Sequence, residues 1–81
     1  MSDVRAALRK RIVDEFMGGQ GQIDDETRLV EEEIIDSLGI FLLLGFIKES
    51  FAVEVDPEDV TIENFASVSA IANLVEKKQV A

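Results

Sequence analysis

The sequence contains no cysteine and no histidine among its 81 residues. Without cysteine the chain has no disulfide bond, no thiolate metal site and no thiol nucleophile. Histidine is the most frequent general base and a common zinc ligand, so its absence removes those roles too. We therefore expect no catalytic residue and no bound metal ion, and we predict that the protein is not an enzyme.

Basic residues are also few: 8 lysines and arginines stand against 17 aspartates and glutamates, which gives a net charge of −9. Such a chain repels the phosphates of nucleic acids and favours partners with basic surfaces. The apolar run 40–47 is too short to cross a membrane, which takes about 20 residues. No signal peptide is recognisable at the N-terminus. We expect a soluble, cytoplasmic monomer that binds no nucleic acid and does not insert into membranes.

The first segment has the pattern of an amphipathic helix. Apolar residues recur at helical spacing along one face, while Arg5, Arg9 and Lys10 take the other side. The apolar positions are Val4, Leu8, Ile12 and Phe16. Ser2 is placed to cap the start of this helix, and Gly18-Gly19 to end it in a left-handed conformation.

A loop rich in acidic residues is predicted from Gly18 to Asp36, where no hydrophobic period holds. Loops of this length are usually functional or anchored by a few buried side chains, and we expect Ile23 and Leu29 to be the anchors. A calcium loop would need alternating Asp or Asn residues with a central glycine, and that pattern is missing. The acidic side chains are therefore expected to face solvent.

A second helix is predicted to begin at Ser37, after Asp36. Ser37 is expected to act as the N-cap, and Asp36 to lie at the positive end of the helix dipole. A serine at a helix N-terminus is also a hydroxyl beside which a phosphate is favoured electrostatically. Local chemistry does not choose between the two roles.

The second helix is apolar on both sides. Nine of the fourteen residues from Leu38 to Phe51 are apolar. One face is predicted to join the core: Ile40, Leu43, Leu44, Ile47 and Phe51. The other face is also apolar: Leu38, Phe41, Leu42 and Phe46. Either the helix is central and covered on most sides, or this second face docks a partner, with Gly39 and Gly45 leaving gaps for close approach.

Two further helices follow. Asp56 is expected to cap a short third helix that starts at Pro57 and ends at Val60 or Thr61. Ser67 is expected to cap a last helix with Lys77 and Lys78 near its end. The buried stripe of that helix is predicted to be Val68, Ile71, Leu74 and Val75. The predicted fold is one all-α domain over 1–81, a small bundle of three main helices plus one short helix.

These motifs together resemble the acyl carrier protein family. The most specific part is Asp36-Ser37-Leu38 at the start of the second helix, after a long acidic loop. The resemblance continues through Glu49-Ser50-Phe51, Asp56-Pro57-Glu58-Asp59 and Thr61-Ile62-Glu63-Asn64-Phe65. It covers nearly the whole chain and implies a fold like that of an acyl carrier protein.

The resemblance implies that Ser37 carries a covalent 4'-phosphopantetheine arm derived from coenzyme A. A phosphopantetheinyl transferase would attach it with the help of magnesium, and Asp36 would help to position that enzyme and its metal ion. The arm would hold acyl intermediates as thioesters and present them to separate acyl-transferring or synthase enzymes. A chain without cysteine must borrow such a thiol, which fits the composition.

Where this sequence departs from the family bears on cargo and partners. Carriers of the main fatty-acid pathway resemble one another in an acidic second helix, whereas this one offers Lys48 and only Glu49 as an acid. Partner contacts are therefore predicted at six residues of the loop and the helix: Glu31, Glu32, Glu33, Leu38, Phe41 and Leu42. Phe41, Gly45 and Phe46 could border a cargo pocket.

The nature of the cargo stays open at this point. We expect acyl groups of specialised lipid or secondary metabolism, loaded by an activating ligase. The string 31–39 is also similar to stand-alone carriers that receive an amino acid from an adenylating ligase, such as D-alanyl carrier proteins. A further alternative is an unmodified helical adaptor that binds partners through Phe41, Leu42 and the acidic loop.

Overall fold

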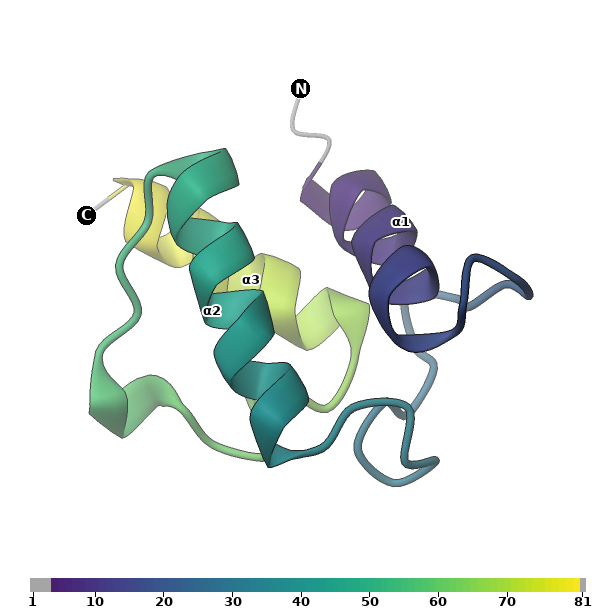
Figure 1. The fold of residues 1–81 in the computed structure, drawn as a ribbon. Helices are drawn as coiled ribbons and strands as arrows, with labels where there is room; N and C mark the ends of the chain where they lie inside the picture. Colours follow the sequence, from purple (N-terminus) through teal and green to yellow (C-terminus); the bar gives the residue numbers. More distant parts are fainter. Residues whose placement is uncertain (1–3, 81) are drawn as a thin grey trace.

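The computed structural model describes residues 4–80, and the regular elements within them are all helical. The order is α1 (Val4–Phe16), α2 (Ser37–Phe51), the 3-10 helix η1 (Pro57–Asp59) and α3 (Val68–Val80) (Figure 1). This confirms the predicted all-α bundle of three main helices and one short helix. The predicted cap at Ser2 lies outside the described residues.

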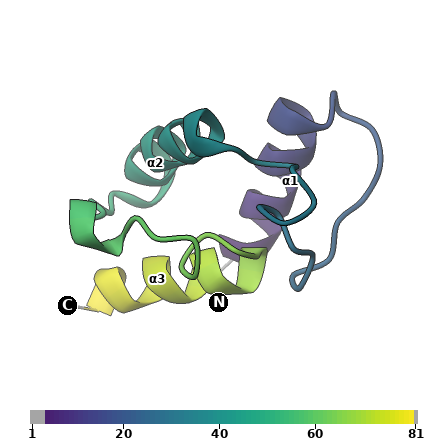
Figure 2. The ribbon, with the colours of Figure 1, turned by 90° about the horizontal axis from the view of Figure 1, so that it is seen from below.

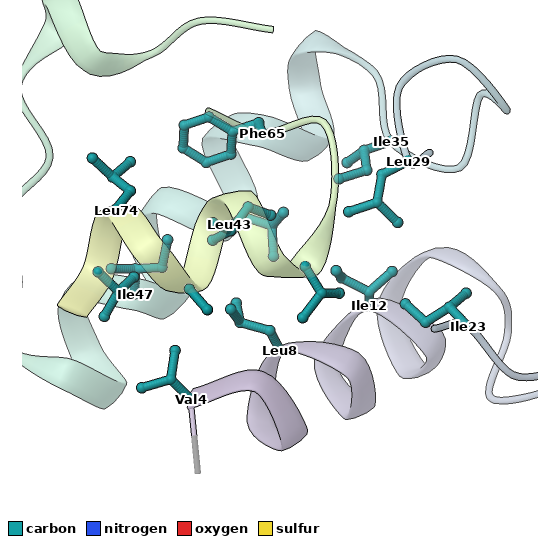
Figure 3. Packing of buried hydrophobic residues seen from close by; sticks show 14 of the residues in the cluster. Val4, Leu8, Ile12, Ile23, Leu29, Ile35, Leu43, Ile47, Phe65 and Leu74 are labelled. Atoms are coloured by element: carbon teal, nitrogen blue, oxygen red, sulfur yellow. The ribbon is translucent and has the colours of Figure 1, made fainter. Parts of the chain in front are cut away.

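The core forms where the apolar stripes of the three long helices meet (Figure 3). α1 contributes Val4, Leu8 and Ile12, and α2 contributes Leu43 and Ile47. From α3 and the turn before it come Phe65, Val68, Ile71, Ala72, Leu74 and Val75. The predicted stripes are confirmed for α1 and α3, except that Phe16 is only partly buried. In α2 the stripe narrows to two fully buried side chains, with Ile40, Leu44 and Phe51 packed at its edge.

The end of α1 follows its glycines. Gly18 and Gly19 have φ angles of 68° and 77°, so both are left-handed, as predicted. The amides of Met17 and Gly19 both donate to the carbonyl oxygen of Val13, at 3.1 and 2.9 Å. The chain then leaves α1 as a long irregular loop along the outside of the bundle (Figures 1 and 2).

Three buried side chains anchor this loop. The predicted anchors Ile23 and Leu29 are both buried, which confirms them. Ile35, which the pattern did not single out, is a third anchor and is 1% exposed. The amide of Leu29 donates to the carbonyl oxygen of Ala66 at 2.8 Å, so the loop is also tied to the entry of α3.

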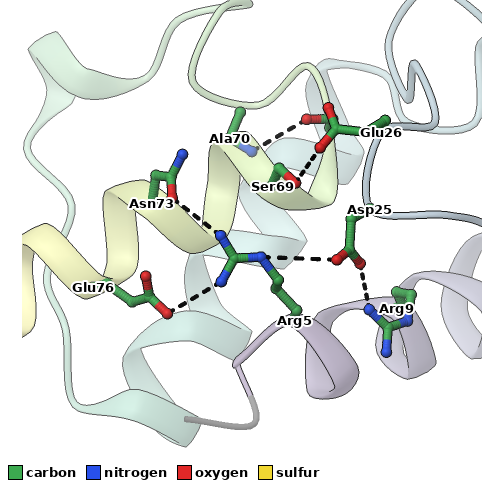
Figure 4. A network of polar contacts seen from close by, with 9 residues as sticks. Arg5, Arg9, Asp25, Glu26, Ser69, Ala70, Asn73 and Glu76 are labelled. Atoms are coloured by element: carbon green, nitrogen blue, oxygen red, sulfur yellow. Dashed lines mark hydrogen bonds and ion pairs between the residues drawn. The ribbon is translucent and has the colours of Figure 1, made fainter.

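Charged side chains hold the first half of the loop between α1 and α3 (Figure 4). Asp25 forms ion pairs with Arg5 and Arg9, and its carbonyl oxygen accepts a hydrogen bond from the Ser69 amide. Glu26 accepts a hydrogen bond from the Ser69 hydroxyl at 2.6 Å. The expectation that the acidic side chains face solvent is therefore wrong for Asp25, which is half-buried between α1 and α3, whereas Glu26 is exposed as predicted although it also binds α3.

Arg5 joins α1 to α3 as well. Its guanidinium donates to Asn73 Oδ1 at 3.2 Å and to Glu76 Oε2 at 3.4 Å (Figure 4). The sequence placed this residue on the side of the helix opposite the apolar stripe. A long charged side chain can cross to a neighbouring helix while its stem covers apolar surface, which hydrophobic periodicity alone does not reveal.

The connection from α2 to α3 is held at both ends. Val53 is 4% exposed and Phe65 is 0% exposed, while no residue from 54 to 64 is fully buried. η1 starts at Pro57, as predicted, but it ends at Asp59, before the predicted end. Asp56 occupies the N-cap position, as predicted, and its carbonyl oxygen accepts the Asp59 amide at 2.9 Å, but its side chain makes no cap hydrogen bond.

Asp56 instead joins an ion-pair cluster with α3. Lys78 Nζ lies 2.9 Å from Asp56 Oδ2 and 2.8 Å from Asp59 Oδ2. The hydrogen bond to Asp59, and then that to Asp56, raise the pKa of Lys78 above its ordinary value. One lysine of α3 thus holds both ends of η1.

We predict that Lys78→Met loosens η1. Without the ammonium, two carboxylates face each other with no cation between them, and η1 has no buried residue to hold it in place. Hydrogen exchange of the Asp59 and Val60 amides, which close the η1 turn, should become several-fold faster. Lys77→Met is the matched control, because it removes the same charge from the same turn of α3; equal effects of the two variants would contradict the assignment.

Candidate functional site

The chain makes a compact turn immediately before α2. The amides of Ile34 and Ile35 both donate to the carbonyl oxygen of Leu29, at 2.9 and 3.1 Å. Glu33 has a φ of 60°, a left-handed conformation that is uncommon for a residue with a side chain. This turn buries Ile35 and points the chain into the first residues of α2.

Asp36, not Ser37, is the N-cap of α2. Its backbone is extended, with φ −114° and ψ −168°, and its Oδ1 accepts a hydrogen bond from the Gly39 amide at 2.9 Å. Its carbonyl oxygen accepts the Ile40 amide at 3.0 Å. The predicted cap at Ser37 is therefore wrong: an aspartate one position earlier satisfies the first-turn amide equally well.

Ser37 is consequently the first residue of the helix, and it is exposed. Its hydroxyl is not needed to cap the helix. It stands at the N-terminal end, where unpaired amides and the helix dipole favour a negatively charged group.

Gly39 fixes the first turn of α2 against the body of the protein. It is buried, and a Cβ atom placed there would overlap the Ile35 side chain and lie 3.0 Å from Phe16 Cε1. The predicted gap at Gly39 is therefore wrong, because the protein's own side chains fill it. Close packing on this side turns the opposite side of the first turn towards solvent.

Three large apolar side chains are exposed on α2. Leu38 is 66% exposed, Phe41 69% and Leu42 53%. Phe46 differs, since it is half-buried, packs edge-on against Phe51 and lies under the Arg11 guanidinium. A helix covered on most sides is therefore wrong for the N-terminal two turns, and the docking face remains the better interpretation there.

A surface hollow of about 360 Å³ opens beside Ser37. Ile40 and the loop residues Val30 and Ile35 line it, and Ile62 comes from the connection before α3. Ile62 is itself 65% exposed. The polar residues around the hollow are Glu33, Asp36 and Ser37. Exposed apolar side chains therefore lie near Ser37 both on α2 and, at Ile62, across this hollow.

The predicted cargo pocket is only partly present. Gly45 lines a second hollow of about 400 Å³, and the space where its Cβ would stand is open. Apolar residues from α2 and the connection after it share this hollow: Leu44, Val53, Val55 and Pro57. Phe41 and Phe46 are not among its lining residues, so the three predicted residues do not border one pocket.

Negative charge gathers at the same end of the molecule as Ser37. Glu31, Glu32 and Glu33 are all exposed, in the turn that leads to Asp36. Within residues 4–80, no group of three or more acidic side chains is arranged so that it could hold a metal ion. No helix in that range is both long and apolar enough to cross a membrane.

Comparison with known proteins agrees with this arrangement. The chain is 29% identical over 75 residues to the probable acyl carrier protein PigG of a Serratia species, a match that covers 91% of this chain and 86% of that protein. The resemblance to acyl carrier proteins is confirmed. No protein-family model matches the sequence. The similarity extends over nearly the whole chain, as the motifs predicted.

We predict that two substitutions of Asp36 will separate the contribution of its side-chain hydrogen bond from that of its negative charge. Asp36→Ala should lower the free energy of unfolding by about 1 kcal/mol, because the Gly39 amide loses its acceptor. Asp36→Asn keeps a side-chain oxygen and should be nearly as stable as the wild-type protein. Urea denaturation followed by circular dichroism measures both, and equal losses for the two variants would show that the charge, rather than the hydrogen bond, stabilises α2.

Proposed function

We propose that this protein is a carrier whose working group is a 4'-phosphopantetheine arm attached through a phosphodiester to Ser37. The observation that carries the proposal is the position of Ser37: an exposed hydroxyl at the first residue of α2, which Asp36 frees from capping. The similarity to a probable acyl carrier protein supports the same role. Ser67, by contrast, uses its hydroxyl to cap α3 at 3.1 Å from the Ala70 amide, as predicted.

The site fits the arm by its own chemistry. A phosphodiester on Ser37 Oγ would lie at the positive end of the α2 dipole, where Ser37 is exposed to solvent. The hollow lined by Val30, Ile40 and Ile62 offers apolar surface next to the attachment point. When bound, the arm would supply a thiol for thioester chemistry that a chain without cysteine lacks.

Attachment requires one group transfer. Ser37 Oγ attacks the β-phosphorus of coenzyme A, a new P–O bond forms, and the P–O bond to the adenosine 3',5'-diphosphate leaving group breaks. The hydroxyl proton would pass to a base of the phosphopantetheinyl transferase. Asp36 is exposed next to Ser37, where it would help to orient that enzyme and its magnesium ion.

The loaded protein would then meet separate enzymes: an activating ligase and acyl-transferring or synthase enzymes. We favour acyl cargo in specialised lipid or secondary metabolism. The aminoacyl alternative, loading by an adenylating ligase, rests on the string 31–39. The intact mass of the protein as isolated from its cells distinguishes the two, because the added group is weighed directly.

The decisive experiment is modification in vitro. The unmodified protein, coenzyme A, magnesium and a broad-range phosphopantetheinyl transferase should give a mass increase equal to one phosphopantetheine group. Ser37→Ala should give none. Ser50→Ala is the matched control, since it removes an exposed hydroxyl from the same helix and should be modified normally. If the protein gains no mass, or if Ser37→Ala gains the same mass, the protein is an unmodified adaptor or another residue is used.

A second prediction concerns charge. Reversal of Glu31, Glu32 and Glu33 to lysine should slow modification at low salt and flatten its dependence on salt concentration. These exposed acids would attract a basic enzyme surface, and that attraction is screened beyond about 10 Å at ordinary ionic strength. Initial rates between low and high salt test this, with Glu49→Lys as a control at the far end of α2. A rate at low salt that does not change would reject the acidic turn as the source of attraction.

A further inference from the structure

The exposed face of α2 lacks charge over its first three turns. From Ser37 to Ile47 no residue is acidic or basic, and three of the large apolar side chains in this stretch are more than half exposed. The exposed side chains are Leu38, Phe41 and Leu42. Exposed apolar side chains that gather on one face mark sites of interaction more often than single ones do.

Ser37 belongs to this face. Residues four apart lie one above the other on a helix, so Phe41 follows Ser37 and Leu42 follows Leu38. Long helical side chains lean towards the N-terminus, which brings Phe41 over the turn that carries Ser37. An enzyme that reaches Ser37 Oγ must therefore cover Phe41 and Leu38.

A second copy of the chain is a poor occupant of the face. Two copies would each bring a net charge of −9, and Glu33 lines the hollow beside Ser37, in the same exposed turn as Glu31 and Glu32. Three side chains also supply far less than the area of about 800 Å² per partner that a stable interface buries. The face suits a transient contact with a partner of opposite charge.

The chemistry of that partner follows from the layout. A lysine or arginine placed over Leu42 would lose its water without gaining a carboxylate, which is costly. At the rim, the glutamates of the turn before Asp36 offer carboxylates with which a lysine or arginine can pair. The partner surface should therefore be apolar where it covers the helix and basic only where it meets the turn.

We propose that the transferase that modifies Ser37 receives Phe41 in an apolar recess bordered by lysine or arginine, and that Phe41 is the anchor of this contact. The inference rests on the proposed function, because it assumes that Ser37 is modified. Apolar contact on α2 would select the transferase, whereas the acidic loop would attract it electrostatically.

The test compares the Phe41→Gln variant with the wild-type protein as substrates of the transferase, with coenzyme A as the donor. KM for the carrier should rise roughly tenfold, equivalent to about 1.4 kcal/mol, while kcat stays unchanged. The ratio of the two KM values should persist in high salt, because apolar contact is not screened. Ser50→Gln, which places the same new side chain about 14 Å further along the helix, should leave KM unchanged.

Each other outcome overturns the inference in a distinguishable way. If both proteins are modified with equal KM, Phe41 is not an anchor, although the proposed function stands. If neither is modified, the proposed function fails and the inference with it. If the KM ratio collapses in high salt, the contact is electrostatic. A concentration-dependent dimer that Phe41→Gln dissociates, seen by sedimentation, would make a second copy the occupant. Leu42→Gln serves as the second variant if circular dichroism shows that Phe41→Gln does not fold.

Discussion

The hydrogen bond from the Gly39 amide to Asp36 Oδ1 decides what the neighbouring serine can do. A helix N-terminus needs an acceptor for its first amides, and either Asp or Ser can provide it. Because aspartate takes that position, the helix begins at Ser37 and the hydroxyl is left on the surface. Had serine been the cap, its oxygen would have been engaged with the backbone of the first turn.

The cap works only because the first turn of α2 is held from beneath. Gly39 allows Ile35 and Phe16 to pack where a Cβ would stand, so the end of α1, the loop and the start of α2 meet at one point. Ile35 is buried there, while Leu29 fixes the turn that precedes it through two backbone hydrogen bonds. The loop thus positions the site, even though it contains no regular secondary structure.

Hydrophobic spacing predicted the three long helices well, because their stripes at positions such as Leu8 and Ile71 are buried against one another. The loop anchors Ile23 and Leu29 were also found, since isolated apolar residues in a polar loop have few other places to go. The cap was misassigned because Asp and Ser are adjacent and both are good caps. The role of Gly39 could not be predicted, since its neighbours come from segments whose meeting depends on tertiary structure.

Long-range charge pairs were beyond the sequence for a similar reason. Lys78 was placed by its position near a helix end, yet its partners Asp56 and Asp59 lie about twenty residues earlier. Asp25 was assigned to solvent, although Arg5 and Arg9 reach it from α1. Charge periodicity reports the face of a helix and not which distant segment will cover that face.

The exposed apolar face and the surplus of negative charge are best understood together. Apolar side chains such as Phe41 and Leu42 favour association, and a chain that only exposed them would tend to aggregate. A net charge of −9 keeps like molecules apart, because every copy repels every other. A basic partner would experience the opposite force, so the same charge that opposes self-association would draw that partner towards the apolar face. Selectivity for such a partner would then arise from two properties that would each be unselective alone.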